Sequence, residues 1–124
     1  PQVECLPGKV IQVFINMIQN AIQAISEEGW IHIKGQFLSG SESPLGQDSV
    51  QIAIIDNGHG ISEEMQSKVF EPFFTTKDIG KGVGLGLSIS YGIMENHNGK
   101  ILLESKEGLG STFKLVFPVV QRPS

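Results

Sequence analysis

The chain has 124 residues, a formal net charge of −4, 40% hydrophobic residues and 18% charged residues. These values fit one ordered globular domain, over residues 1–124, with a single hydrophobic core. No run of Lys and Arg marks a nucleic-acid-binding surface, and no apolar segment approaches the roughly 18 residues that a membrane-spanning helix needs. We therefore expect a domain that contacts neither nucleic acid nor a membrane.

The first residues of the chain give expectations about the cellular compartment and about the length of the parent protein. Cys5 is the single cysteine, so an internal disulfide cannot form, which favours a reducing compartment such as the cytoplasm. We expect no signal peptide. The abrupt opening PQVECLPGK predicts a piece of a longer protein, and we expect this piece to be monomeric. Whether the parent protein is anchored in a membrane is left open.

Hydrophobic periodicity predicts the secondary structure. In the first half we expect an edge strand at 2–5, a helix over 9–26, strands over 30–38 and 49–56 joined by a polar loop, and a short helix from Ser62. In the second half we expect a long segment over 71–83, a helix over 84–96, and hairpin strands over 100–106 and 111–118. This order predicts an α+β fold, a two-layer sandwich with a mixed, mostly antiparallel sheet of about five strands against about three helices.

Two asparagines lie in the middle of the first predicted helix. Asn16 and Asn20 are four residues apart, so they share one side of the helix. Asparagine is a weak helix former, so the pair needs an explanation. One is a solvated polar face, shared with Gln12, Gln19 and Gln23. The other is a pair of amide oxygens facing a pocket, since hard cations such as Mg²⁺ bind such oxygens.

The stretch IIDNGHGIS places an acid at the end of an apolar strand. A turn at Asp56 accounts for the Asp-Asn-Gly sequence but leaves Gly60 unexplained. In the other interpretation, the Asp56 carboxylate accepts a hydrogen bond from an amino group such as the exocyclic amine of adenine. Gly58 and Gly60 would then let a flat base approach the backbone, and Ile61 would pack on its face.

The stretch GKGVGLGL leads glycines directly into a predicted helix. Unpaired N–H groups at a helix N-terminus carry a positive partial charge and suit phosphate. The stretch is neither a dinucleotide fingerprint, since no βαβ unit surrounds it, nor a Walker loop, since no Gly-Lys-Ser/Thr follows. Lys77 and Lys81, just upstream, are either phosphate ligands or plain surface lysines, and the glycines supply hinges.

A few further polar residues are candidates for the same site. Thr112 follows the hairpin turn EGLG, and we expect its hydroxyl to join Asp56 at a base. His59, between two glycines, is interpreted as an exposed turn residue. His97 is interpreted as a cap at the end of the second long helix.

Five ordered motifs resemble the N, G1, F, G2 and G3 boxes of the sensor histidine kinases of two-component systems. They are Asn16-x-x-x-Asn20-Ala21, Asp56-x-Gly58-x-Gly60, Phe70-x-Pro72-Phe73-Phe74-Thr75-Thr76-Lys77, Gly82-x-Gly84-Leu85-Gly86-Leu87 and Gly108-x-Gly110-Ser111-Thr112-Phe113. The resemblance covers about residues 3 to 119. FEPFFTTK and NAIQAI look most like the nitrogen-regulatory type of kinase.

The resemblance implies the Bergerat α/β sandwich shared with gyrase, Hsp90 and MutL, with ATP and Mg²⁺ as cofactors. It implies that Asn20 is the Mg²⁺ ligand, that Asn16 supports the phosphate and metal region, and that 71–83 form an ATP lid. Asp56 would hold the adenine amine. The expected nucleotide-binding residues are Asn16, Asn20, Gln23, Asp56, Gly58, Gly60, Ile61, Lys77, Lys81, Gly82, Val83, Gly84, Leu85, Gly86, Leu87 and Thr112.

Two departures from the family pattern shape the expected function. Many of these kinases carry Lys or Arg where this chain has Gln23, so we expect Lys77 or Lys81 to supply a cation. The dimerisation helices and the phosphoacceptor histidine motif are absent, and none of the three histidines occupies such a motif. The resemblance therefore implies a catalytic domain that supplies the γ-phosphate to a histidine on a separate dimerisation domain, from which a response-regulator receiver domain accepts it.

Particular residues distinguish the histidine kinases from other proteins of the same fold. The hydrolases of the gyrase, Hsp90 and MutL branch place a general-base Glu where this chain has Asn16, an amide that cannot take a proton. A serine kinase of the anti-sigma type is a nearer relative, but the FFTTK stretch favours the histidine kinases. A non-catalytic nucleotide-binding module is disfavoured by intact Asn20, Asp56 and glycines.

Overall fold

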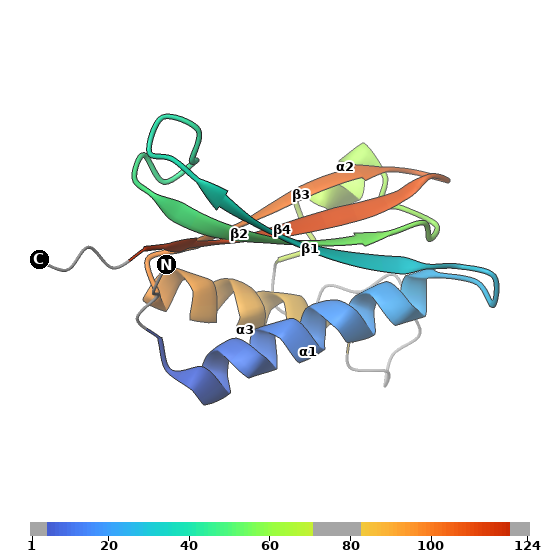
Figure 1. Cartoon of the computed structure of the whole chain (residues 1–124). Coiled ribbons are helices and arrows are strands. Elements are labelled where there is room, and N and C mark those ends of the chain that lie inside the picture. The colour runs from blue at the N-terminus through green and yellow to red at the C-terminus, as the bar shows by residue number, and fades with distance from the viewer. Residues whose placement is uncertain (1–4, 71–82, 120–124) are drawn as a thin grey trace, which may run out of the picture.

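The structure of the chain is a computed structural model that describes residues 5–70 and 83–119. Within these ranges three helices and four strands occur (Figure 1). In chain order they are α1 (Pro7–Ala24), β1 (Ile31–Leu38), β2 (Ser49–Asp56), α2 (Glu63–Gln66), α3 (Val83–Asn96), β3 (Lys100–Lys106) and β4 (Gly110–Pro118).

The strands form one sheet in the order β1-β2-β4-β3, and each neighbouring pair is antiparallel. α1 and α3 lie side by side against one face of this sheet (Figure 1). The two-layer α+β sandwich predicted from the sequence is confirmed. The described residues hold four strands rather than about five, because residues 2–4 of the predicted edge strand lie outside them and Cys5 is not in a strand.

Element bounds agree with the sequence predictions to within about two residues. α1 begins at Pro7 because proline suits the first turn of a helix, where its missing N–H would have no partner. It ends at Ala24. α3 begins at Val83, one residue before the predicted start.

The hydrophobic core lies between the sheet and the two long helices. Val13, Met17 and Ala21 recur at helical spacing on α1 and are buried. They face Ile54 of β2 and Phe113 of β4, which are register partners and belong to the same buried cluster. Packing of one apolar helix stripe onto one sheet face therefore holds the domain together.

Strand alternation decides which polar residues face the helices. Successive side chains of a strand point to opposite faces of the sheet. Asp56 and Ser111 are register partners two positions beyond Ile54 and Phe113, so both lie on the helix-facing side. Thr112 is paired with Ile55 and lies on the other, open face.

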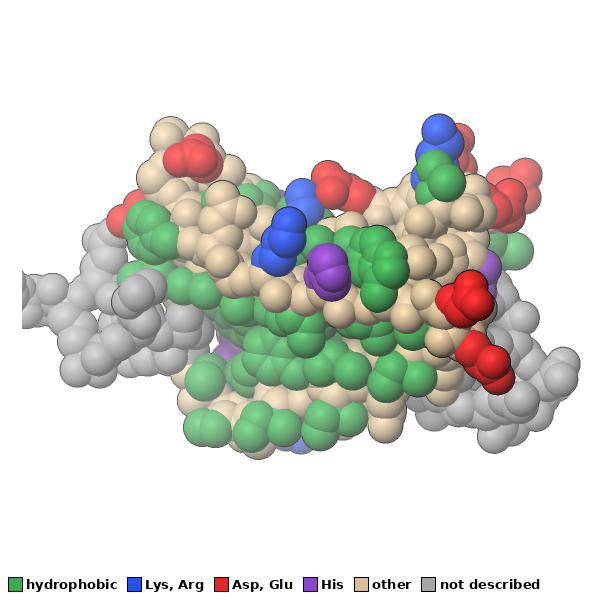
Figure 2. All heavy atoms as spheres, turned by 45° about the vertical axis from the view of Figure 1, so that its right-hand side comes forward, with side chains coloured by type: hydrophobic (Ala, Val, Ile, Leu, Met, Phe, Trp, Pro, Cys, Tyr) green, Lys and Arg blue, Asp and Glu red, His purple; other side chains and the backbone are tan. Residues whose placement is uncertain are grey.

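Exposed hydrophobic side chains gather on one side of the molecule. Figure 2 shows hydrophobic side chains as a band across the middle and lower part of the view. The exposed large hydrophobic residues of α1 and β1 are Ile11, Ile15, Ile22, Ile33 and Phe37. Such a surface is typical of a region that contacts another protein or another domain. Among the described residues, no helix combines the length and the hydrophobicity needed to cross a membrane.

Candidate functional site

A buried carboxylate lies at the end of the central strand β2. Asp56 is 3% exposed, and its Oδ1 accepts a hydrogen bond from the N–H of Gly58 at 2.8 Å. Among the described residues, no other hydrogen bond to this carboxylate is present. A carboxylate offers about four lone-pair sites. Asp56 therefore has spare acceptor capacity for an amino group of a ligand.

The loop that follows Asp56 is clamped between α1 and the β3–β4 hairpin. The N–H of His59 donates to the carbonyl of Ala24 at 3.0 Å. A Cβ on Gly58 would lie 2.3 Å from the same carbonyl oxygen, and one on Gly60, whose φ is 71°, would lie 2.2 Å from the carbonyl oxygen of Lys106. Close contact with protein backbone thus accounts for both glycines, and the approach of a base to them stays a prediction.

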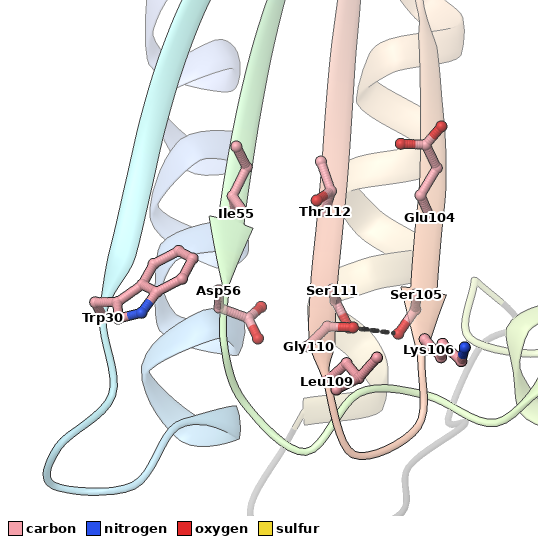
Figure 3. Close-up of a pocket in the computed structure, with 10 residues that line it drawn as sticks. All are labelled: Trp30, Ile55, Asp56, Glu104, Ser105, Lys106, Leu109, Gly110, Ser111 and Thr112. Carbon is pink, nitrogen blue, oxygen red and sulfur yellow. Dashed lines mark hydrogen bonds between the residues drawn. The ribbon is translucent and has the colours of Figure 1, made fainter.

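Three polar side chains form a row across the end of the sheet. Asp56, Ser111 and Ser105 occupy facing register positions on β2, β4 and β3 (Figure 3). The Oγ atoms of Ser111 and Ser105 are 2.7 Å apart, and the N–H of Ile61 donates to Ser105 Oγ at 2.8 Å. Asp56 and Ser111 are nearly closed to solvent, at 3% and 6% exposed, whereas Ser105 is half-buried.

The sequence predicts that Thr112 joins Asp56 at a base; both residues line the same cavity, and this role stays a prediction. The side chain of Thr112 does not share a face with Asp56, because Thr112 lies one residue beyond Ser111 on β4 and points to the open face. Ser111 takes the place beside Asp56. The signal in the sequence was the period of two: Ser111 and Phe113 must share a face, and Phe113 is the hydrophobic residue that belongs in the core.

The placement of Ser111 and Thr112 on different faces predicts different outcomes for these two neighbouring hydroxyls. Ser111→Ala should weaken ATP binding by roughly threefold to tenfold, since it removes a polar partner beside the Asp56 carboxylate. Thr112→Ala, on the open face, should change it less than twofold. Calorimetric titration of the two variants checks this, and a larger loss in Thr112→Ala would place Thr112 rather than Ser111 at the nucleotide.

The two asparagines of α1 lie on its border with α3. Asn16 Nδ2 donates to Ser90 Oγ at 3.2 Å, and the N–H of Leu6 donates to Nε2 of His97 at 3.0 Å. The contact at the start of α1 is with the end of α3, and the contact further along α1 is with an earlier residue of α3. The two helices are therefore antiparallel. Asn20, half-buried and one turn beyond Asn16, consequently lies toward the start of α3.

Asn20 also lies near the Asp56 loop. It is one turn before Ala24, whose carbonyl receives the N–H of His59. The same end of the molecule thus holds Asn20, the Asp56–Gly60 loop and the first turn of α3. Gln23 is exposed on α1, and it is not without an interaction partner.

The glycine-rich stretch supplies the N-terminus of α3. The helix begins at Val83, so its first-turn N–H groups come from 83–86, as a phosphate site needs. Leu87 is 6% exposed and packs in the core. Several predicted features lie outside the described residues: Lys77, Lys81, Gly82, and residues 71–82 of the lid predicted over 71–83. The surroundings of Val83, Gly84, Leu85 and Gly86 beyond the helix backbone are likewise not described.

Phe70, where the FEPFFTTK stretch begins, is anchored in the core. Its ring lies 5.5 Å from that of Tyr91 and 6.2 Å, edge-on, from that of Phe113. A hydrogen bond to Glu95, one turn along α3, raises the pKa of Tyr91 above its ordinary value. The start of the segment that leads to the predicted lid is therefore fixed against α3 and β4.

The histidines behave as predicted from the sequence. His97 is a cap: its Nδ1 lies 2.8 Å from the carbonyl oxygen of Ile93, while Nε2 accepts the N–H of Leu6. His59 is exposed in the turn. Neither ring is placed for catalysis by these contacts.

A shallow cavity of about 390 Å³ opens at the sheet end, lined by Trp30, Asp56, Leu109 and Thr112 among others (Figure 3). It does not include Asn16 or Asn20 of α1. Among the described residues, its lining includes Asp56 and Thr112 of the predicted nucleotide-binding residues, together with Ser105 and Ser111. The cavity therefore borders the polar row at the sheet end and does not reach the asparagines of α1.

Residues 6–121 match the family model described as "Histidine kinase-, DNA gyrase B-, and HSP90-like ATPase". The chain belongs to this family. It is 40% identical over 121 residues to sporulation kinase E of Bacillus subtilis, covering 98% of this chain and 15% of that protein. It is 41% identical over 119 residues to the sensor histidine kinase ZraS of Escherichia coli K12, covering 96% of this chain and 23% of that protein.

Solved structures agree with this membership. The chain resembles a nucleotide-free catalytic domain of the histidine kinase ThkA, with a TM-score of 0.77 and 38% identity, over 94% of this chain and 70% of that one. The chain is thus a catalytic ATPase domain of the histidine kinase type, and a hydrolase, a serine kinase or a non-catalytic module is not favoured. It spans less than a quarter of the length of the two curated relatives.

Proposed function

We propose that this domain binds ATP with Mg²⁺ and supplies the γ-phosphate to a histidine on a separate dimerisation domain. The observation that carries the proposal is the buried Asp56 carboxylate, which keeps acceptor capacity at the end of the sheet where α3 begins and Asn20 lies. A response-regulator receiver domain would then take the phosphoryl group. Because the substrate is ATP, we place this domain in the cytoplasm.

The adenine end of the site would use Asp56 and Ser111. The carboxylate accepts a hydrogen bond from the adenine amine. Because Asp56 is buried, this bond contributes more to the affinity for the base than it would in water. Guanine presents an oxygen at the position of that amine, and an oxygen facing a carboxylate is repelled. The site should therefore prefer ATP to GTP.

The phosphate end would use the start of α3 and the amide of Asn20. Helix N–H groups bind phosphate oxygens. The amide oxygen of Asn20 is a hard donor of the kind that Mg²⁺ accepts beside phosphates and water, and the half-buried place of this residue toward α3 fits that role. When bound, Mg²⁺ would neutralise phosphate charge. Lys77 or Lys81 would supply the positive charge near the phosphates that the neutral Gln23 does not provide.

The contact of Asn16 supports transfer rather than hydrolysis. Its side-chain Nδ2 donates to the buried Ser90, so the amide is held between the two helices. An amide cannot take a proton from water. Asn16 would therefore keep α1 and α3 together next to the phosphates without activating water for attack on ATP.

Phosphorylation in trans tests the proposal. The 124-residue chain is incubated with ATP labelled at the γ-phosphate, first alone and then with a dimerisation domain of the parent that carries the phosphoacceptor histidine. We expect an acid-labile label on the added domain and none on this chain. A domain that releases free phosphate at the same rate with or without the partner would be a hydrolase, contrary to the proposal.

Asn20→Asp should alter the dependence of ATP binding on Mg²⁺. A carboxylate binds the cation more strongly than an amide but repels the phosphates, so we expect the Mg²⁺ concentration at half-saturation to shift severalfold. Titration of Mg²⁺ at fixed ATP measures this shift. Asn98→Asp, in the turn after α3, makes the same change far from the site, and equal curves for both variants would remove Asn20 from the metal site.

A further inference from the structure

One hydroxyl in the row at the sheet end has three hydrogen-bonding neighbours. Ser105 Oγ donates to the carbonyl of Gly110 at 3.0 Å and lies 2.7 Å from Ser111 Oγ, and Figure 3 shows these three residues together. Ser105 Oγ also accepts the N–H of Ile61 at 2.8 Å. Ser105 itself lies on the edge strand β3, two strands from Asp56. Its side chain therefore links the loop, the hairpin and the buried Ser111.

Hydrogen counting shows that this pair of hydroxyls has two states. A serine hydroxyl carries one hydrogen and two lone pairs. If Ser105 donates to Gly110, then Ser111 donates to Ser105 and offers only lone pairs to a ligand. If Ser105 donates to Ser111, the hydrogen of Ser111 is released for donation elsewhere. The distances permit both states, because 2.7 Å and 3.0 Å are within the range for such bonds.

The two states differ in what they offer to a base. The Watson–Crick edge of adenine combines a donor, the amine on C6, with an acceptor, the ring nitrogen N1. Asp56 supplies an acceptor and never a donor while it is ionised. A site that reads both atoms needs a donor beside this carboxylate, either directly or through a water. Ser111, the register partner of Asp56, becomes that donor in the second state.

We propose that Ser105 is a positioning residue that orients the hydroxyl of Ser111 as a donor toward N1 of adenine. The inference rests on the proposed function, because it assumes that ATP occupies the site. Ser105 acts through Ser111 and does not touch the base. A chain of hydroxyls also polarises the terminal donor, which strengthens its bond to the ligand.

A second set of contacts keeps Ser105 in place. Gln66 Nε2 donates to the carbonyl of Ile61 at 2.8 Å and to the carbonyl of Ser105 at 3.1 Å. Together with the bond from Ile61 N–H to Ser105 Oγ, this side chain ties the loop after Asp56 to β3. A residue fixed by several such bonds can hold its neighbour in one geometry.

Binding of ATP and of 1-deaza-ATP, which lacks the N1 acceptor, tests the role of Ser105. The ratio of their two Kd values measures the N1 contact. In the wild-type chain we expect ATP to bind roughly tenfold more tightly than the analogue. Ser105→Ala should reduce this ratio to about twofold, Ser111→Ala should abolish it, and Ser105→Thr, which keeps a hydroxyl, should restore it.

A matched control separates orientation from general loosening. Ser49 is 0% exposed, and its Oγ lies 2.7 Å from that of Ser43 at the opposite end of the sheet. Ser49→Ala thus removes the same kind of buried serine pair, and it should leave the ratio unchanged even if stability falls. Should Ser105→Ala not fold, Ser105→Cys gives the same readout, because a thiol is a poor hydrogen-bond partner.

The outcomes distinguish this inference from the proposed function. If the wild-type chain binds ATP and prefers it to GTP, but the ratio is the same in Ser105→Ala or falls equally in Ser49→Ala, the role of Ser105 is overturned while the function stands. A wild-type ratio near one also overturns it. If the wild-type chain binds no ATP, the proposed function falls and this inference with it.

Discussion

Asp56→Asn is expected to weaken ATP binding by roughly tenfold to a hundredfold, which corresponds to about 1–3 kcal/mol for a lost hydrogen bond to a charged group. The asparagine can still accept the N–H of Gly58 through its amide oxygen, so the loop after β2 should keep its turn. Its NH₂ group then faces the adenine amine, donor against donor. The same NH₂ can donate to the oxygen of guanine. The ratio of ATP affinity to GTP affinity should therefore fall by a larger factor than the affinity for ATP.

Calorimetric titration with ATP and GTP measures both effects. Asp48→Asn is the matched control, because Asp48 Oδ1 accepts the N–H of Gly40 at 2.9 Å in the loop at the far end of the sheet. It changes the same charge and keeps a similar backbone bond. Equal nucleotide affinities for the Asp56 variant and the wild-type chain would remove Asp56 from the adenine site.

Gly60→Ala should destabilise the domain by about 3 kcal/mol or more. Its φ of 71° is unfavourable for alanine by about 1–2 kcal/mol. In addition, the new Cβ would lie 2.2 Å from the carbonyl oxygen of Lys106, and neither backbone can move without breaking the packing of the loop on the hairpin. Losses of this size come from specific mechanisms such as backbone clash and strain.

Gly46 offers a control with almost the same backbone angle. Its φ is 72°, but no heavy atom would lie within 4 Å of an added Cβ. Gly46→Ala should therefore cost only the conformational strain, about 1–2 kcal/mol. Denaturant unfolding of both variants isolates the effect of the clash as their difference. If the two free energies of unfolding were equal, the loop after Asp56 would not be clamped as described.

The sequence was sufficient for the architecture and for the individual motifs. Helical spacing on α1 and alternation on β2 and β4 predict the core, and the same patterns place Asn16, Asn20 and Asp56 on the right elements. The position of the asparagines next to α3 could not be predicted, because the sequence of α1 alone does not show which side of the helix packs against α3. The contact between Asn16 and Ser90, which are 74 residues apart, decides this.

The spatial neighbours of the site residues could not be predicted from the sequence. Ser111 and Thr112 are adjacent, and in a strand a shift of one residue moves a side chain to the other face. Gly58 and Gly60 lie against the backbone of Ala24 and Lys106, which are distant in sequence. Long-range contacts of this kind appear only once the strands are paired. Ser105 was missed for the same reason.

Binding of nucleotide by the 124-residue chain tests the central claim most directly. The measurement is calorimetric titration with ATP and ADP, with and without Mg²⁺, and with GTP as the control. The account predicts adenine-selective binding that Mg²⁺ strengthens. Binding of GTP as tight as that of ATP, or no binding of either nucleotide to the folded chain, would contradict it.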